Sequence, residues 1–193
     1  MKKFIGVLAL LVMPVLAFAA QTPTDRVKLG VADIISIATN NTLDAQQKKQ
    51  SLGDVIEAHV DFQASAQRVL GKYWRDATDE EKREFIGLLK SVLVDTYIVL
   101  LEKYDNQTVV FTGESIKKDV YATVDTEIKS KDLVIPVSYQ LYKRGDDWRI
   151  YDFVAEGISM IRSFSNDYAS TLKKDGVSGL NAALKAKLTA DKG

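Results

Sequence analysis

The sequence predicts an α+β fold, because the spacing of its apolar residues changes twice along the chain. From residue 22 to about residue 104, apolar residues recur every three or four positions, which is typical of amphipathic helices. From about residue 107 to residue 155, apolar and polar residues alternate, which is typical of strands. Helical spacing returns from about residue 158 to residue 188. We therefore expect N-terminal helices, an antiparallel four-stranded sheet and C-terminal helices.

Three helices are predicted before residue 72. The first begins after Thr22, where the proline at position 23 suits a first helical turn, and it ends at residues 40–42. The second begins at about Asp44, and the third is short and stops at Gly71. Their apolar stripes consist of Val27, Val31, Ile34, Ile35 and Ala38 in the first helix, Leu52, Val55 and Ile56 in the second, and Phe62, Ala66, Val69 and Leu70 in the third.

A long helix is predicted from Thr78 to about residue 104. Thr78 and Glu81 have the spacing of a capping box, in which each side chain accepts a hydrogen bond from the backbone amide of the other residue. We interpret the acidic run at residues 79–84 as the solvated first turns of this helix and not as a metal site, because acids there suit the helix dipole. The stripe that follows is wide enough to be contacted from two directions: Phe85, Leu88, Leu89, Val92, Leu93, Thr96, Tyr97, Leu100 and Leu101.

Four strands are predicted next. The first covers residues 108–113, the second residues 120–128 and the third residues 133–141. A turn at residues 144–146 leads into the fourth strand, which begins at Trp148. The third and fourth strands are therefore expected to pair as a hairpin.

The fourth strand is the most informative segment of the chain. By alternation, one face carries Trp148, Ile150 and Val154, and the other carries Arg149, Tyr151 and Phe153. Both faces are largely apolar, so we expect the strand to be covered on both sides and to line a cavity. The strand breaks at Gly157, after which Ser159 is expected to cap a helix over residues 158–174. Asp175 and Gly176 separate this helix from a last one at residues 178–188.

The N-terminus predicts export. Two lysines, an apolar run over residues 4–18 and a small-x-small sequence at residues 17–19 have the pattern of a secretory signal peptide that is removed after Ala19. We expect a periplasmic protein whose single domain covers residues 20–193. Removing residues 1–19 takes away two of the 26 basic residues and no acid, which leaves 24 against 26. This balance gives no reason to expect a nucleic acid partner, and nothing in the sequence predicts more than a monomer.

Few residues suggest catalysis. The chain has no cysteine and a single histidine, His59, so we do not expect a metal site or a nucleophile–base pair centred on it. The sequence has no phosphate-binding glycine loop, no dinucleotide fingerprint and no Gly-x-Ser-x-Gly motif, and no cofactor is expected. Asp152 and Glu156 can in principle form an acid–base pair. A buried carboxylate that accepts hydrogen bonds from backbone or arginine groups is the commoner arrangement, and we favour it.

Two segments resemble the MlaC family, the toluene-tolerance phospholipid-binding proteins of Gram-negative bacteria. One covers residues 69–85 and continues through Tyr97 of the long helix. The other has the pattern Trp-x-x-Tyr-Asp-x-x-x-Glu-Gly-x-Ser at residues 148–159, followed later by Gly176. The order of the predicted elements also agrees with the family. Residues 163–167 depart from it, since many relatives carry a Tyr-Arg-containing segment there.

The resemblance implies a periplasmic carrier that holds a phospholipid by its acyl tails in a deep apolar pocket enclosed by the sheet and the helices. It also implies two membrane partners, an inner-membrane ABC transporter with a lipid-binding ring and an outer-membrane lipoprotein–porin complex. The implied role is to maintain the lipid asymmetry of the outer membrane. Such a carrier needs no catalytic group, so we do not expect an enzyme.

Strand alternation and helix phase indicate which residues face the pocket. We expect lipid contacts from Val92, Thr96, Tyr97, Leu100 and Leu101 in the long helix, from Val124, Val137, Tyr139, Leu141, Ile150 and Phe153 in the sheet, and from Ile158, Ile161 and Phe164 in the helix that follows. For each of these residues, ordinary core packing is the alternative.

Two other functions fit parts of the sequence. A small-molecule enzyme on a cone-shaped α+β scaffold would use Asp152 or Glu156 as its acid or base, beside a tyrosine such as Tyr139. A periplasmic adaptor without a ligand would have a filled interior and an exposed apolar patch. A carrier instead has a large apolar cavity that is open at one end.

Overall fold

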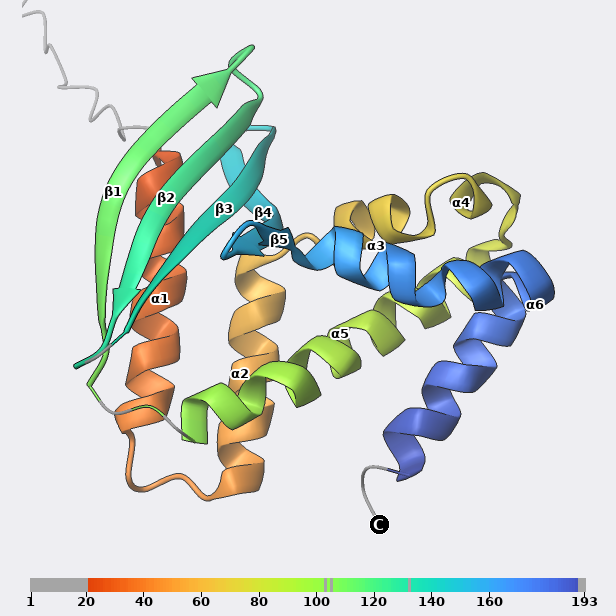
Figure 1. Cartoon of the computed structure of the whole chain (residues 1–193), viewed down its shortest axis with the longest axis horizontal. Coiled ribbons are helices and arrows are strands. Elements are labelled where there is room, and N and C mark those ends of the chain that lie inside the picture. The colour runs from red at the N-terminus through yellow and green to blue at the C-terminus, as the bar shows by residue number, and fades with distance from the viewer. Residues whose placement is uncertain (1–20, 103, 105, 132, 191–193) are drawn as a thin grey trace, which may run out of the picture.

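The computed structural model describes residues 21–102, 104, 106–131 and 133–190, and it has the expected α+β architecture (Figure 1). The predicted signal peptide at residues 1–19 lies outside the described residues. The helices are α1 (Pro23–Thr39), α2 (Ala45–His59), α3 (Phe62–Leu70), α4 (Tyr73–Asp76), α5 (Asp79–Glu102) and α6 (Met160–Ala190). The strands are β1 (Thr108–Lys117), β2 (Tyr121–Lys129), β3 (Val134–Arg144), β4 (Asp147–Ala155) and β5 (Ile158–Ser159), and they form an antiparallel sheet in this order.

The sheet has one strand more than the sequence predicted. Ala155 of β4 pairs with Ile158 of β5, and the two residues between them, Glu156 and Gly157, have φ angles of 51° and 81°. Positive φ at both central residues is typical of a two-residue hairpin turn. The chain therefore folds back as a short strand before it becomes helical, and the helix that was predicted from residue 158 begins at Met160.

The caps of α1, α2 and α5 and the bend in α6 lie where the sequence predicted, whereas the short helix α4 was not predicted. Thr22 and Asp44 cap α1 and α2 through their side chains. The capping box before α5 is present, because the Glu81 amide donates to Thr78 Oγ1 at 3.1 Å and the Thr78 amide donates to Glu81 Oε2 at 2.8 Å. The predicted break near Gly176 is a kink within α6, at which this glycine has a φ of 68°.

Helix α1 covers part of one face of the sheet, which we call the inner face. Val27 of α1 is fully buried and packs in a cluster with Ala122, Val124, Leu141, Trp148 and Ile150 of the sheet. Strand β4 is contacted by three helices, α1, α3 and α6. This α1–sheet core fixes one half of the inner face.

The alternation predicted for β4 is wrong beyond Ile150. Leu141 of β3 pairs with Ile150, but the preceding β3 residue pairs with Asp152, so Tyr151 is the extra residue of a β-bulge. The bulge reverses the alternation, and Phe153 therefore lies on the inner face with Ile150, opposite Tyr139. Nothing in the local sequence pattern indicates a bulge at this position.

A second core joins α3, α5 and α6. Its buried members include Phe85 and Leu89 of α5, Val69 of α3, and Leu172 and Leu180 of α6. Figure 1 shows α5 and the first half of α6 running side by side away from the sheet. The molecule thus has an α1–sheet core and an α3–α5–α6 core, and β4 lies where the two meet.

A hydrogen-bonded carboxylate ties α3 to the sheet. Asp61 is 8% exposed and accepts hydrogen bonds from the amide of Ala64 at 2.9 Å, from Arg144 Nη1 at 3.1 Å and from the hydroxyl of Tyr142. Its own amide donates to the carbonyl of Ile150 at 2.8 Å. Burial opposes ionisation, but the hydrogen bonds from Tyr142, Ala64 and Arg144 together hold the pKa of Asp61 below its ordinary value. Burial and the bond to Asp61 raise the pKa of Tyr142 to about 12.

We expect Asp61 to stabilise the fold in a pH-dependent way. Because its pKa is lower in the folded protein than in the unfolded chain, its charge stabilises the fold above about pH 4, and this contribution is lost as the pH falls through the folded pKa. The variant Asp61→Asn can keep the helix cap but loses the charge. Its free energy of unfolding should fall by about 2 kcal/mol at about pH 7 and by much less at about pH 2.

Urea denaturation at the two pH values measures this difference. Asp76→Asn is the control, because the side chain of Asp76 is 76% exposed at the end of α4. An equal loss of stability for Asp61→Asn at both pH values would contradict the assignment.

Candidate functional site

Apolar and aromatic side chains gather where α5, α6 and the inner face of β4 meet. Tyr97 of α5, Phe153 of β4, and Ile161, Phe164 and Tyr168 of α6 are half-buried, and all five pack against the edge of the α3–α5–α6 core. The rings of Tyr97 and Phe153 meet edge to face, with centroids 5.0 Å apart. The rings of Phe164 and Tyr168 are stacked, with centroids 5.6 Å apart. We call these five residues the aromatic junction.

Three tyrosines at and beside the junction are desolvated but not fully covered. Burial raises the pKa of Tyr97 to about 12, with a further contribution from the charge of Asp152. Burial also raises the pKa of Tyr168 to about 12, and it raises the pKa of Tyr139 on the inner face of β3. All three side chains nevertheless keep accessible surface. These three side chains are therefore partly buried and partly accessible.

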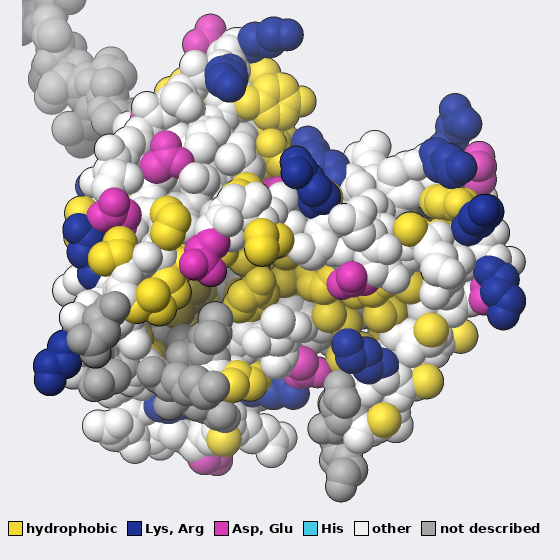
Figure 2. All heavy atoms as spheres, in the orientation of Figure 1, with side chains coloured by type: hydrophobic (Ala, Val, Ile, Leu, Met, Phe, Trp, Pro, Cys, Tyr) yellow, Lys and Arg dark blue, Asp and Glu magenta, His cyan; other side chains and the backbone are white. Residues whose placement is uncertain are grey.

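The space-filling view shows the apolar surface of this region from outside (Figure 2). In Figure 2, apolar side chains gather in a band over the lower part of the sheet and over α5 and α6, and the face is hollowed where these elements meet. On the inner face of the sheet, Val137 is buried, and the paired residues Ile128 and Ile135 are half-buried. The half of the inner face that α1 does not seal therefore continues into the aromatic junction as one apolar surface.

The structure places the other predicted site residues in several environments. Val92 is buried in the α3–α5–α6 core, and Val124, Leu141 and Ile150 are buried in the α1–sheet core. Thr96 is exposed and its hydroxyl donates to the Val92 carbonyl at 2.7 Å, while Ile158 is 65% exposed in β5. The side chains of Leu100 and Leu101 lie outside the described residues. The residues that the structure brings together are Tyr97, Phe153, Ile161 and Phe164, with Val137 and Tyr139 on the adjoining inner face.

Sequence reasoning missed three side chains of this surface. Tyr168 follows Phe164 by four positions, so the helical spacing that selected Phe164 also indicates Tyr168. Ile128 and Ile135 follow the same strand alternation as Val124 and Val137. In each case the periodicity continued through these residues, but the predicted site did not include them.

Asp152 serves as a structural acceptor at the start of α6. The side chain is buried; its Oδ2 accepts from the Ser159 hydroxyl at 2.6 Å and its Oδ1 accepts from the Ile161 amide at 3.0 Å. Ser159 Oγ in turn accepts from the amide of Arg162 at 3.1 Å, which confirms the predicted cap. Two first-turn amides of α6 are thus satisfied, and the helix that carries Ile161 and Phe164 is fixed to β4.

Removing this carboxylate should be costly for stability. Asp152→Ala leaves the Ile161 amide and the Ser159 hydroxyl without their buried acceptor, and we expect the free energy of unfolding to fall by roughly 3 kcal/mol. Asp152→Asn keeps one carbonyl oxygen and should lose about half as much. Urea denaturation of both variants measures the difference. A fully stable alanine variant would contradict the capping role.

The remaining titratable candidates do not form a catalytic arrangement. Glu156 is exposed in the β4–β5 turn, whereas Asp152 is buried and hydrogen-bonded. His59 is buried at the end of α2, and its Nε2 lies 2.8 Å from Asp33 Oδ2 on α1. In the part of the chain that the structure describes, no three His, Cys, Asp or Glu side chains are grouped so that they could hold a metal ion.

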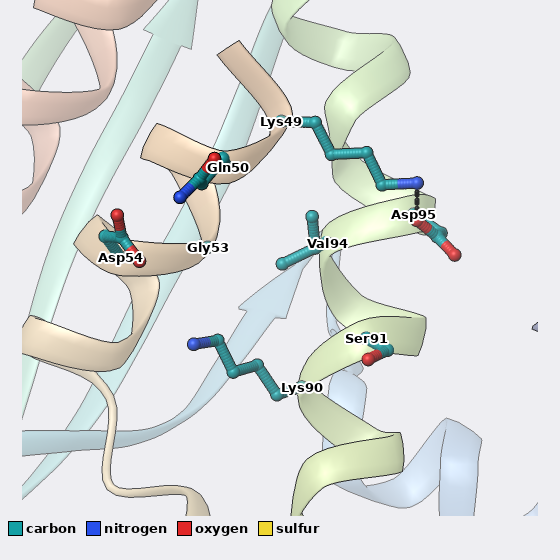
Figure 3. A pocket seen from close by; sticks show the side chains of 8 residues that line it. All are labelled: Lys49, Gln50, Gly53, Asp54, Lys90, Ser91, Val94 and Asp95. Atoms are coloured by element: carbon teal, nitrogen blue, oxygen red, sulfur yellow. Dashed lines mark ion pairs between the residues drawn. The ribbon is translucent and has the colours of Figure 1, made fainter. Parts of the chain in front are cut away.

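Two surface cavities lie away from the aromatic junction. One, of about 250 Å³, lies between α2 and α5 and is lined mainly by charged and polar residues, and Lys49 pairs with Asp95 across it (Figure 3). The other, of about 400 Å³, is formed by α2, α3, α5 and the β3–β4 hairpin. Neither is lined by any residue that we predicted to contact lipid. The first is smaller than the roughly 300–1,000 Å³ usual for ligand pockets, and its charged lining does not suit acyl tails.

Comparison with known proteins gives a consistent result. Residues 30–186 match the family model described as MlaC protein. The chain is 25% identical over 178 residues to the toluene tolerance protein ttg2D of Pseudomonas putida, which covers 89% of this chain and 83% of that protein. It is 23% identical over 127 residues to the intermembrane phospholipid transport system binding protein MlaC of Haemophilus influenzae, which covers 63% of this chain and 59% of that protein.

A solved structure is similar over nearly the same length. It is the phospholipid-binding protein from Ralstonia solanacearum in complex with a phospholipid, with a TM-score of 0.79 and 25% sequence identity. The similarity covers 89% of this chain and 97% of that chain. Among the helices in the described part of our chain, none is long and apolar enough to cross a bilayer.

Proposed function

Because the chain belongs to the MlaC family, we propose that it is a periplasmic phospholipid carrier that holds the acyl tails of its lipid beside the aromatic junction. The observation that carries this proposal is the apolar surface that runs from Val137 and Tyr139 on the inner face to Phe153, Ile161 and Phe164. The similar Ralstonia solanacearum protein, which was solved in complex with a phospholipid, supports the same kind of ligand.

The physical task of such a carrier is to cover apolar surface. A two-tailed phospholipid has on the order of 28 methylenes, each worth about 0.8 kcal/mol, so roughly 22 kcal/mol opposes its passage through water as a free molecule. A surface of half-buried aliphatic and aromatic side chains can offset most of this cost. The headgroup can stay in water, so the site needs few specific polar contacts.

This task requires no catalytic group, and we infer that the protein is not an enzyme. The enzyme alternative depended on Asp152 and Glu156, and Asp152 is engaged in the cap of α6. The adaptor alternative holds no ligand, whereas the similar Ralstonia solanacearum protein was solved in complex with a phospholipid. The relatives also favour lipid binding over both alternatives.

We propose the cellular role that the family implies. The carrier would exchange lipid with an inner-membrane ABC transporter that has a lipid-binding ring and with an outer-membrane lipoprotein–porin complex, and so maintain the lipid asymmetry of the outer membrane. The name of the Haemophilus influenzae relative, an intermembrane phospholipid transport system binding protein, supports this role. Removal of a signal peptide after Ala19 belongs to the same proposal.

A transfer assay tests the carrier function. Donor vesicles with a fluorescent phospholipid are separated from acceptor vesicles by a membrane that passes the protein but not vesicles. We expect transfer to rise in proportion to the protein concentration, and long-tailed phospholipids to compete better than short-tailed ones with the same headgroup. Transfer that follows the headgroup and ignores the tails, or no transfer at all, would contradict the proposal.

A further inference from the structure

The cavity of about 400 Å³ has a lining unlike that of the lipid site. It lies between the C-terminal end of α2, the start of α3, the first half of α5 and the β3–β4 hairpin. Its floor is apolar, because Val60, Phe62 and Ile86 reach it from the α3–α5–α6 core. The volume is within the range usual for small-molecule sites.

The walls of this cavity concentrate positive charge. Four basic side chains line it: Arg83 and Lys90 from α5, Arg144 from β3 and Arg149 from β4. Two carboxylates, Glu57 and Asp61, also line it, so the formal charge of the lining is four minus two, or +2. The whole chain has a formal net charge of 0, so this lining is more positive than the chain as a whole.

Most of these charges are held in place by neighbours. Lys90 pairs with Glu57, and Arg144 Nη1 lies 3.1 Å from Asp61 Oδ2. Arg149 pairs through Nε with Asp147 at 3.1 Å and donates from Nη1 to the Ala58 carbonyl.

Arg83 differs from the other three basic residues. It is exposed, and it makes no ion pair with any residue that the structure describes. Three basic side chains of the cavity are therefore held by ion pairs, and Arg83 makes no ion pair with the described residues.

We propose that this cavity binds a phosphate group, at a site separate from the acyl-tail surface. Guanidinium groups offer paired N–H donors that match phosphate oxygens, and they do so better than ammonium groups. A phosphate would supply a counter-charge to Arg83, the one lining cation that makes no ion pair with the residues that the structure describes. The phosphate can arrive as a free ion or as part of a lipid headgroup at a membrane surface, since both present negatively charged non-bridging oxygens.

Calorimetric titration with inorganic phosphate at about pH 7.5 and constant ionic strength tests the site. We expect saturable binding with a dissociation constant of roughly 1 mM, weakened about tenfold in Arg83→Ala and retained in part by Arg83→Lys. Arg75→Ala is the matched control, because the side chain of Arg75 is 87% exposed on α4, and it should bind as the unsubstituted protein does. Absence of saturable binding, or equal binding by Arg83→Ala, would overturn the proposal.

A second measurement distinguishes the two sources of phosphate. If headgroups reach the cavity, the protein should float with phosphatidylglycerol vesicles, and both inorganic phosphate and Arg83→Ala should reduce flotation. If flotation is unaffected while calorimetry shows the site, free phosphate is the ligand. The phospholipid content of purified Arg83→Ala should stay unchanged in either case, so that loss of this site and loss of the carrier function remain distinguishable.

Discussion

Replacing Phe164 by aspartate is expected to lower the phospholipid that co-purifies with the protein at least about tenfold, because the substitution places a charge against the acyl tails. Phe164 is half-buried and stacks on Tyr168 at the edge of the α3–α5–α6 core, so the variant should still fold. Phosphorus analysis of solvent-extracted protein measures the loss, and circular dichroism checks the fold. Phe164→Leu keeps an apolar side chain and should retain most of the lipid.

The control for this substitution lies on another surface. Leu29 of α1 is 48% exposed, and Leu29→Asp introduces the same charge away from the aromatic junction. We expect its lipid content to equal that of the unsubstituted protein. A folded Phe164→Asp variant with a full complement of lipid would remove Phe164 from the site.

Replacing Phe85 by alanine should cost about 3–5 kcal/mol in the free energy of unfolding. Phe85 is fully buried in the α3–α5–α6 core, and its ring meets that of Tyr168 edge to face with centroids 6.3 Å apart. The substitution leaves a cavity in the core that holds α5 against α6, and it also removes the support of one junction tyrosine. Urea denaturation of the purified variant measures the loss.

Leu88→Ala is the comparison for Phe85→Ala, because Leu88 lies on the same helix but is only half-buried. Its cost should be clearly smaller, since fewer contacts are lost and less of a cavity remains. If the two substitutions lower the free energy of unfolding by the same amount, the α5–α6 packing described above does not determine the stability of this region.

The helices were predictable because their ends are set by local chemistry. The Thr78–Glu81 capping box and the kink at Gly176 depend on residues within a few positions of one another, and both appear where the sequence placed them. The β4–β5 hairpin was missed because its turn uses Glu156 at positive φ, a conformation that residues other than glycine seldom adopt. The bulge at Tyr151 was missed because it depends on pairing with β3.

The candidate site was predictable only in part, and for a related reason. Helix phase selected Tyr97, Ile161 and Phe164, which the structure brings together. Alternation assigned Phe153 to the face opposite Ile150, and only the bulge returns it to the inner face. Periodicity also selected Val124 and Leu141, which are fully buried beneath α1, because a pattern shows which side of a strand is apolar but not what covers that side.

Native mass spectrometry of the purified mature protein, followed by solvent extraction and lipid identification, tests the central claim most directly. The carrier function predicts a folded protein with stoichiometric phospholipid, whose occupancy depends on the acyl tails and tolerates different headgroups. The extracted lipid would also give the number of tails held beside the aromatic junction. A lipid-free mass that persists after incubation with phospholipid vesicles would contradict the proposed function.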